Sequence, residues 1–200
     1  MGRKASIPGE ADFLGRGVSY CAICDAAFFR GKVVCVLCDS EEAVKEAGLL
    51  TRFAETVYLI APSRKLKVTD DNPALDAPNL KIITGHTVTS ITGNEAVEKI
   101  QLKDIEGKSG EIELSGVFVY LHGSKPVVDF LQQAVETSDN DCIITNTMKE
   151  TKVPGVFSAG DVTCTEVRQV IVAAAHGCLA ALSAEKYVFH RSRRKYDWHG

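Results

Sequence analysis

Two cysteines separated by two residues, with an aspartate directly after them, form the most reactive combination in this sequence. They are Cys21, Cys24 and Asp25 in the stretch GVSYCAICDAAFFRGK, residues 17–32. A C-x-x-C pair at a helix start can close a small disulfide ring, and the helix N-terminus lowers the pKa of the first thiol. The adjacent carboxylate can carry the proton that dithiol exchange moves. The spacing indicates a redox dithiol, with half a zinc site or two small apolar side chains as open alternatives.

A second pair, Cys35 and Cys38, extends the pattern to C-x2-C-x10-C-x2-C, a spacing that zinc sites use. Cys35 falls inside a predicted strand, where residues i and i+3 point to opposite faces. The two thiols would converge poorly on one metal, so we predict no metal site. Cys35 is interpreted as a small buried hydrophobic residue, and the same interpretation is given to Cys142, Cys164 and Cys178.

The turn after the first predicted strand lacks the glycines that bind a dinucleotide. A pyrophosphate needs G-x-G-x-x-G/A there, because side chains would block it from the helix N-terminus. This chain has VLCDSEEA at residues 36–43, and the three carboxylates in it would repel phosphate. We therefore do not expect a dinucleotide to bind at this turn, and we interpret Arg64 and Lys65 as a solvated surface pair.

A second candidate binding element ends in Gly160 and Asp161. Residues 151–162, TKVPGVFSAGDV, are interpreted as an apolar strand that ends at this pair. Glycine admits close backbone approach, and an aspartate just past a strand can bond a ligand hydroxyl. An aspartate in a turn is more often a cap, so both roles stay open.

The hydrophobic spacing around these residues predicts an α/β fold. Residues 32–38 and 56–62 are typical of buried strands, and residues 40–54 have helical spacing with Ser40 as N-cap. Strand, helix and strand in this order form a βαβ unit of a parallel sheet. Short alternating strands with GN and EGKSG turns follow as a β-meander. A long helix over about residues 167–188 closes the fold.

The composition is that of an ordinary globular chain. Of its 200 residues, 45% are hydrophobic and 24% are charged. Its apolar stretches are too short for a membrane span, and its start lacks the apolar core of a secretory signal. With seven cysteines and no such signal, we expect a reducing compartment: the cytoplasm, or an organelle stroma or matrix. The formal charge of −3 gives no general attraction for nucleic acid, and the basic tail HRSRRK is interpreted as a solvated end.

Several segments together resemble the low-molecular-weight thioredoxin reductases. They are IPGEADFLGRGVSYCAICDAAFFRGK before the βαβ unit, then GVFVYLHGSKP, and finally VPGVFSAGDVTCTEVRQVIVAAAHGCLAALSAEKYV. The resemblance implies a two-domain flavoprotein. Residues 4–120 would form a Rossmann-like, three-layer nicotinamide-type domain with a β-meander. Residues 121–189 would be the C-terminal part of an FAD-binding domain, followed by a basic tail at residues 190–200.

The resemblance also implies the activity of a flavin-dependent disulfide oxidoreductase. Electrons would pass from FAD through the dithiol to thioredoxin or a similar disulfide. Cys21 would reach the disulfide of thioredoxin, Cys24 would lie next to the flavin, and Asp25 would be the general acid.

The FAD-binding part carries further matches to the family. Asp161, beside Gly160, matches the aspartate that bonds the ribityl chain of FAD. The positions that contact the flavin are matched by Arg168, Gln169 and Val170. GxxP at residues 123–126 matches the return of the chain into the FAD-binding domain.

Two departures from the family bear on the electron supply. The family has an N-terminal segment with GxGxxG that seats the FAD pyrophosphate, and this chain begins after it. We therefore expect a truncated chain with an incomplete FAD site. The NADPH fingerprint is missing as well, as in relatives that use ferredoxin, so we expect a donor other than NADPH, with a ferredoxin-type protein as a candidate. The family precedent is a homodimer.

Two other hypotheses stand beside this one. The incomplete cofactor set is typical of a non-catalytic, truncated relative that acts as a partner-binding module. The intact C-x-x-C-D argues against it, because nothing structural needs those three residues together. A zinc-stapled binding module is the third hypothesis, and it would contain stoichiometric zinc.

Overall fold

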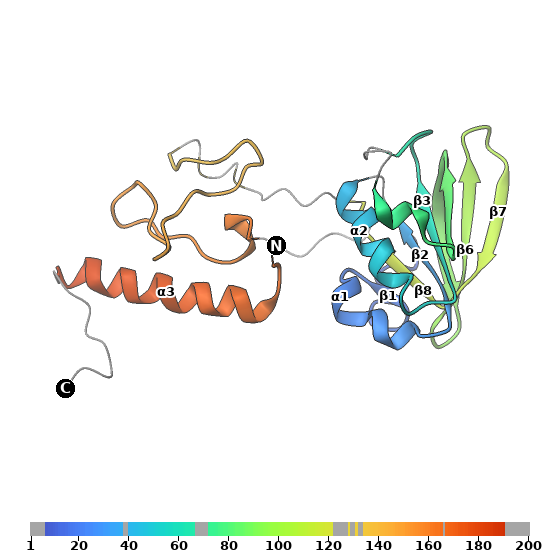
Figure 1. Ribbon diagram of the computed structural model, residues 1–200, viewed down its shortest axis with the longest axis horizontal. Coiled ribbons are helices and arrows are strands. Elements are labelled where there is room, and N and C mark those ends of the chain that lie inside the picture. The colour runs from blue at the N-terminus through green and yellow to red at the C-terminus, as the bar shows by residue number, and fades with distance from the viewer. Residues whose placement is uncertain are drawn as a thin grey trace. The chain divides into compact units, whose positions relative to one another are not determined.

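The computed structural model divides the chain into two compact units, Met1–Gly123 and Ser124–Gly200. The residues that it describes are 7–37, 40–66, 72–121, 128, 131, 134–165 and 167–190. In Figure 1 the labelled strands all belong to the first unit, and the long helix α3 belongs to the second. Within the described residues, no helix combines the length and the apolar character that a membrane crossing requires.

A five-stranded parallel sheet forms the centre of the first unit. In β2 and β8 the side chains are almost all apolar rather than alternating, as expected of parallel strands that are covered on both faces. The predicted βαβ unit is confirmed, because β2 and β3 are adjacent and parallel. The strands in spatial order are β1 (Val18–Ser19), β8 (Gly116–Val119), β2 (Val33–Leu37), β3 (Thr56–Ala61) and β4 (Leu80–Thr84).

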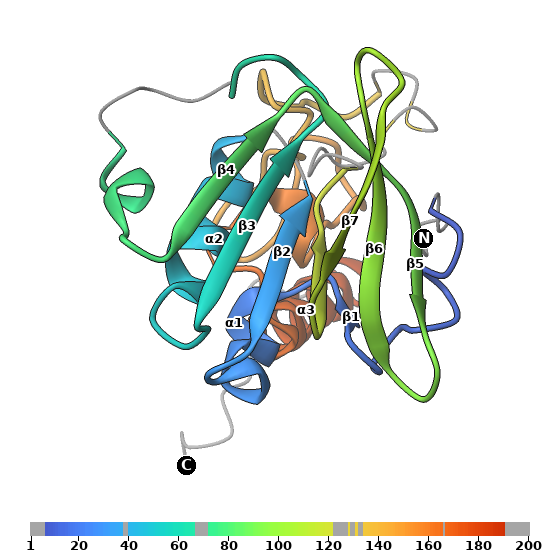
Figure 2. The ribbon, with the colours of Figure 1, turned by 90° about the vertical axis from the view of Figure 1, so that its right-hand side faces the viewer.

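The predicted β-meander is a separate antiparallel sheet. Its strands are β5 (His86–Gly93), β6 (Val97–Asp104) and β7 (Ser109–Glu113), in this spatial order. Figure 2 shows these three strands beside the parallel strands β2, β3 and β4. Buried residues recur along β5 and β6 between exposed ones, which is typical of a sheet with one covered face.

Helices cover one face of the parallel sheet, and the antiparallel sheet covers the other. The helices α1 (Ala22–Asp25) and α2 (Glu41–Leu50) share a buried cluster with Val34 and Val36 of β2. The intervening Cys35 belongs to a second buried cluster, with residues of β5 and β6. Alternate residues of β2 therefore pack against two different layers, the helices on one face and the antiparallel sheet on the other. The predicted three-layer α/β architecture is confirmed.

The helix α2 begins where the sequence predicts it and ends earlier. The side chain of Ser40 caps it by accepting a hydrogen bond from the backbone N–H of Ala43 at 3.3 Å. At the other end, the side-chain amide of Asn79 donates to the carbonyls of Thr51 and Ala54, each at 3.0 Å. These carbonyls belong to the turn that replaces the predicted last helical turn. The short 3₁₀ helices of this unit include η1 (Ala26–Phe29) and η2 (Pro73–Asp76).

In its described part, the second unit contains turns, loops, the 3₁₀ helix η4 (Asp161–Thr163) and the long helix α3 (Val170–Val188). The prediction of a strand over residues 151–162 is wrong. The chain folds back there, with Gly155 at φ 83° and the N–H of Thr151 bonded to the carbonyl of Val156 at 3.1 Å. The proline and glycine at the tip of this turn fit a tight reversal and cannot continue a strand.

Candidate functional site

Cys21 and Cys24 lie where β1 runs into α1, at the carboxyl end of a strand of the parallel sheet. They form a disulfide with their Cα atoms 5.3 Å apart. Cys21 is the N-cap of α1, with an extended backbone, and its sulfur accepts a hydrogen bond from the N–H of Cys24 at 3.2 Å. The same N–H would stabilise a thiolate at Cys21 after reduction of the disulfide. The local geometry therefore supports dithiol chemistry.

Ser19 orients the carboxylate of Asp25 next to this pair. Its hydroxyl donates a hydrogen bond to Asp25 Oδ2 at 2.6 Å and accepts one from the N–H of Cys21 at 3.1 Å. Ser19 is buried and Asp25 is half-buried, so the carboxylate is ordered and still reaches solvent. Sequence reasoning missed Ser19. Its place at the end of a strand, two residues before the first cysteine, is the signal that could have found it.

Tyr120 connects the first turn of α1 to a distant part of the chain. Its hydroxyl accepts a hydrogen bond from the N–H of Ala22 at 3.0 Å and donates one to Glu46 Oε2 at 3.1 Å. Tyr120 directly follows β8, and Glu46 belongs to α2. These bonds hold α1 against both the end of β8 and the helix α2. Sequence reasoning missed Tyr120 because 98 positions separate it from Ala22.

The helical segment with the disulfide has exposed apolar side chains. Cys24 is exposed and Cys21 is half-buried. On the same segment, Ile23 is 64% exposed and Phe28 is 73% exposed. Large apolar side chains that remain in solvent beside a reactive group are typical of a surface that contacts another protein or a planar ring.

The turn that lacks dinucleotide-binding glycines is described only in part. Cys38 and Asp39 lie outside the described residues. Ser40 occupies the N-terminus of α2 through its bond to the first turn. Glu41 forms an exposed ion pair with Lys45 at 3.1 Å. Arg64 and Lys65, which follow β3, are both exposed, as expected of a surface pair.

The predicted burial of the other cysteines is confirmed for some and wrong for others. Cys35 is confirmed as a buried residue, and burial raises the pKa of its thiol. Cys178 is exposed, so its interpretation as buried is wrong; the face of α3 that carries it also exposes Ile171. In the part of the chain that the structure describes, no three His, Cys, Asp or Glu side chains gather closely enough to hold a metal ion.

Cys142 and Cys164 were interpreted as small buried hydrophobic residues; burial is confirmed for Cys142 and is only partial for Cys164. They form a disulfide with their Cα atoms 5.4 Å apart, although 22 positions separate them in the sequence. No short spacing could signal this pair, because only the folding of the second unit brings the two residues together.

The turn with Gly160 and Asp161 lies against the first turns of α3. Gly160 has φ 79°, a left-handed backbone that favours glycine, and a Cβ there would lie 3.4 Å from Ala173 Cβ. Asp161 begins the 3₁₀ helix η4 (Asp161–Thr163) and is exposed. The structure thus places this left-handed turn and an exposed carboxylate next to the start of α3.

The remaining predicted flavin residues lie at the helix start itself. The helix begins at Val170 rather than near residue 167, because Gln169 is its N-cap with an extended backbone, φ −127° and ψ 145°. Arg168 and Val170 are exposed, and Gln169 is half-buried. An exposed guanidinium, an amide and a carboxylate near one helix start are groups that hold a polar ligand.

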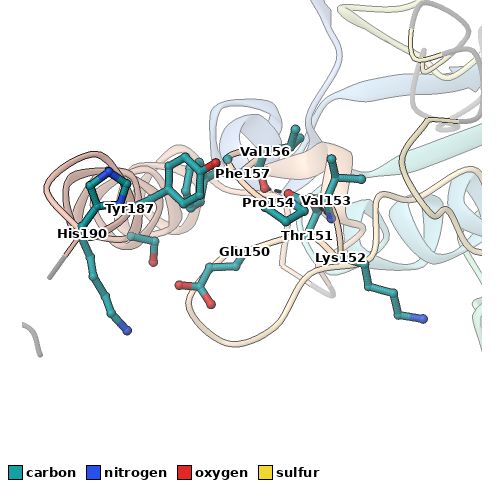
Figure 3. Close-up of a pocket in the computed structure, with 12 residues that line it drawn as sticks. Glu150, Thr151, Lys152, Val153, Pro154, Val156, Phe157, Tyr187 and His190 are labelled. Carbon is teal, nitrogen blue, oxygen red and sulfur yellow. Dashed lines mark hydrogen bonds between the residues drawn. The ribbon is translucent and has the colours of Figure 1, made fainter. Parts of the chain in front are cut away.

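A pocket of about 380 Å³ lies in the second unit, between the turn at residues 150–157 and the C-terminal end of α3 (Figure 3). Phe157 and Tyr187 both line it, with their ring centroids 6.2 Å apart in an edge-to-face contact. The buried hydroxyl of Ser183 donates to the carbonyl of Met148 at 2.8 Å. The residues that the sequence predicts as site residues do not line this pocket.

Comparison with known proteins identifies the family. The family model described as pyridine nucleotide-disulphide oxidoreductase matches residues 1–177. The chain belongs to this family. A thioredoxin reductase of Aquifex aeolicus is 44% identical over 201 residues, which cover 99% of this chain and 62% of that protein.

Solved structures of the family agree. The thioredoxin reductase of Streptococcus pyogenes is 31% identical, with a TM-score of 0.85 over 94% of this chain and 62% of that one. A ferredoxin-flavin thioredoxin reductase from Clostridium acetobutylicum is also 31% identical, with a TM-score of 0.52 over 96% of this chain and 61% of that one. The resemblance inferred from the sequence is confirmed, and the chain spans about three-fifths of the length of these relatives.

Proposed function

We propose that this chain is the dithiol-bearing part of a flavin-dependent disulfide oxidoreductase of the thioredoxin reductase type. The observation that carries the proposal is the Cys21–Cys24 disulfide at the start of α1, with Asp25 held beside it by Ser19. A structural cross-link needs neither an exposed cysteine nor an ordered carboxylate, and this site has both. The relatives named thioredoxin reductase support thioredoxin, or a similar protein disulfide, as the substrate.

The reduced pair would act in two thiol–disulfide exchange steps. The thiolate of Cys21 attacks one sulfur of the substrate disulfide, so that a mixed disulfide forms and the other substrate sulfur leaves as a thiolate. The thiolate of Cys24 then attacks the sulfur of Cys21, which releases the second substrate thiolate and restores the Cys21–Cys24 disulfide. Asp25 would accept the proton of Cys24 and pass protons to the leaving thiolates. Two electrons and two protons move from the dithiol to the substrate.

The second unit would hold the flavin. When bound, FAD supplies the electron pair that returns the disulfide to the dithiol. The residues at the start of α3 fit such a group, because the exposed carboxylate of Asp161 follows the left-handed backbone of Gly160. We propose that Asp161 accepts a hydrogen bond from a ribityl hydroxyl, and that Arg168, Gln169 and Val170 contact the flavin.

The proposed electron donor is a protein of the ferredoxin type rather than NADPH. Ser40 caps α2, and Glu41 places a carboxylate in its first turn, where a dinucleotide phosphate would have to approach. The similarity to the ferredoxin-flavin thioredoxin reductase supports this choice. In the FAD-loaded protein, reduced ferredoxin should bleach the flavin absorbance, and micromolar NADPH should not. Bleaching by NADPH would contradict the proposed donor.

The dithiol half-reaction can be tested without flavin. The chain is reduced, freed of reductant and mixed with an equal amount of oxidised thioredoxin, and alkylated peptides are followed by mass spectrometry. Thioredoxin should gain its dithiol while Cys21 and Cys24 become a disulfide. The Cys24→Ser variant should accumulate a mixed disulfide through Cys21, and Cys178→Ser, which removes another exposed cysteine, should behave as the unmodified chain.

Two results would reject this function. One is exchange at the normal rate by Cys21→Ser. The other is a chain whose Cys21 and Cys24 do not exchange at all but which co-purifies with a partner protein. That second result would favour the non-catalytic partner-binding module.

A further inference from the structure

The Cys142–Cys164 disulfide joins two tight turns of the second unit, and no step of the proposed reaction uses it. Cys142 closes the first turn: Ser138 N–H donates to its carbonyl at 2.9 Å, and its own N–H donates to Ser138 Oγ at 3.3 Å. Cys164 closes the second turn, where its N–H donates to the carbonyl of Asp161 at 2.9 Å. The disulfide therefore links a peripheral turn to the turn that begins at Asp161.

The backbone of Cys164 depends on its surroundings. Its φ is 48° and its ψ is 56°, a left-handed conformation that is uncommon for residues other than glycine, asparagine and aspartate. Such a conformation persists only where the rest of the structure holds it. The disulfide holds this residue covalently, and a backbone hydrogen bond from Ile143 N–H to the carbonyl of Val162, at 3.0 Å, joins the same two turns. Loss of the covalent link should let the second turn relax.

The two cysteines of this pair differ in exposure. Cys164 is half-buried, whereas Cys142 is buried. Exchange requires an incoming thiolate to reach one sulfur while the other leaves. The more exposed Cys164 is therefore the residue for an incoming thiolate to attack, with Cys142 as the leaving group.

We propose that Cys142 and Cys164 form a second thiol–disulfide exchange site, with dithiols as its substrate class, and that its oxidised state fixes the turn beginning at Asp161. A thiolate of the dithiol attacks Cys164 Sγ, the Cys142–Cys164 bond breaks, and Cys142 leaves as a thiolate that takes up a proton. The second thiol of the dithiol then attacks its partner sulfur and releases Cys164. The dithiol ends as a disulfide, and two electrons and two protons have passed to the pair.

Reduction of this site should also weaken flavin retention, because Asp161 is the first residue of the turn that the disulfide fixes. This consequence rests on the proposed function, whereas the exchange site itself does not. The two are separated by measuring cysteine redox state and flavin binding independently.

The first experiment equilibrates the full chain with graded ratios of reduced to oxidised dithiothreitol. Free thiols are trapped by one alkylating agent, and the remaining cysteines are reduced and labelled with an isotopic form of the same agent. Cys142 and Cys164 should titrate together and reversibly as one two-electron couple, while Cys178 reacts at every ratio. A pair that stays oxidised until the chain unfolds, or one that is alkylated at every ratio, would overturn the proposal.

The second experiment measures amide hydrogen exchange in the two redox states. It uses the Cys21→Ser, Cys24→Ser double variant, so that any change arises from the second pair. Amides of residues 160–165 should exchange at least about tenfold faster after reduction, as expected of local opening, while those of β2 should not change. Equal rates in both states would overturn the fixing of the turn.

Flavin retention is measured in the same samples from the fluorescence of added FAD. Weaker retention after reduction is the expected result. If neither redox state retains FAD, as the expected incomplete FAD site would give, the link between the disulfide and flavin retention is rejected for this chain, and the titration still decides the exchange site. If both states retain FAD equally, the link between the disulfide and Asp161 is wrong.

Discussion

The two disulfides that the structure describes, Cys21–Cys24 and Cys142–Cys164, have nearly the same backbone separation but different origins. The Cα atoms are 5.3 Å apart in Cys21–Cys24 and 5.4 Å apart in Cys142–Cys164. In the first pair, three positions separate the residues, and the N-cap geometry of one short helix sets their distance. In the second pair, Cys164 lies 22 positions after Cys142, and two turns must fold before the sulfurs meet. A disulfide can therefore be a local feature or a product of tertiary folding at the same final distance.

Their surroundings differ as well. Beside the first pair lies the carboxylate of Asp25, which accepts a hydrogen bond from the hydroxyl of Ser19. The second pair closes turns held by backbone hydrogen bonds, one of which contains a left-handed cysteine. The first arrangement suits the proposed proton transfer, whereas in our proposal the second would couple a redox state to backbone conformation. The predictions below test this division.

The largest expected effect is on thioredoxin reduction. Replacing Cys21 by Ser should lower the exchange rate of the pre-reduced chain by at least about a thousandfold, because the attacking thiolate is gone. Cys164→Ser should leave this rate unchanged, since it removes no group of the first site. Stopped-flow mixing followed by alkylation measures both rates. A large loss in Cys164→Ser would mean that the two pairs do not have separate roles.

The second prediction concerns stability and reverses the order of the two pairs. Replacing both Cys142 and Cys164 by serine should lower the free energy of unfolding by about 3 kcal/mol, because their cross-link closes a long loop. Removing both Cys21 and Cys24 should cost about 2 kcal/mol, since the ring that they close is short. Urea unfolding under oxidising conditions, with hydrogen exchange in α3 and β2 as local probes, measures each loss. Equal losses would contradict the loop-length argument.

The third prediction isolates the hydroxyl beside each pair. Ser19→Ala should slow thioredoxin reduction on the order of tenfold, a part of what a positioned proton carrier contributes. Ser19→Thr, which keeps a hydroxyl, should recover most of the rate, and this recovery separates positioning from a loss of fold.

The matched control is Ser138→Ala, because Ser138 Oγ accepts the N–H of Cys142 at 3.3 Å beside the second pair. It should leave thioredoxin reduction unchanged and alter only the dithiothreitol titration of Cys142 and Cys164. The reverse outcome, with Ser138→Ala slowing thioredoxin reduction and Ser19→Ala having no effect, would exchange the roles of the two sites.

The smallest effect tests how far the local pair depends on tertiary contacts. Tyr120→Phe removes the acceptor of the buried Ala22 N–H and should lower the stability of the first unit by about 1 kcal/mol. Tyr58→Phe is the control in the same unit, because it keeps the ring that lies 5.3 Å from Lys81 Nζ. Urea midpoints of the two variants give the comparison. A larger loss for Tyr58→Phe would show that the contact with Ala22 contributes little.

The features that the sequence predicted correctly all depend on short spacings. The apolar run of β2, the helical period after Ser40 and the GN turn each act over a few residues, and the structure confirms the elements that they predict. The wrong prediction of a strand and the wrong interpretations of cysteines lie in the second unit. An apolar composition favoured a strand over residues 151–162, but Pro154 and Gly155 reverse the chain there.

The sequence by itself determined that Cys21 and Cys24 lie at a helix start and that a βαβ unit follows, because helix N-caps and strand periods depend on neighbouring residues. Only the tertiary structure decided that Tyr120 supports Ala22 and that Cys142 bonds to Cys164. Closing such long loops costs entropy that no local pattern repays, so these contacts depend on the packing of the whole unit. No short stretch of the sequence predicts packing of this kind.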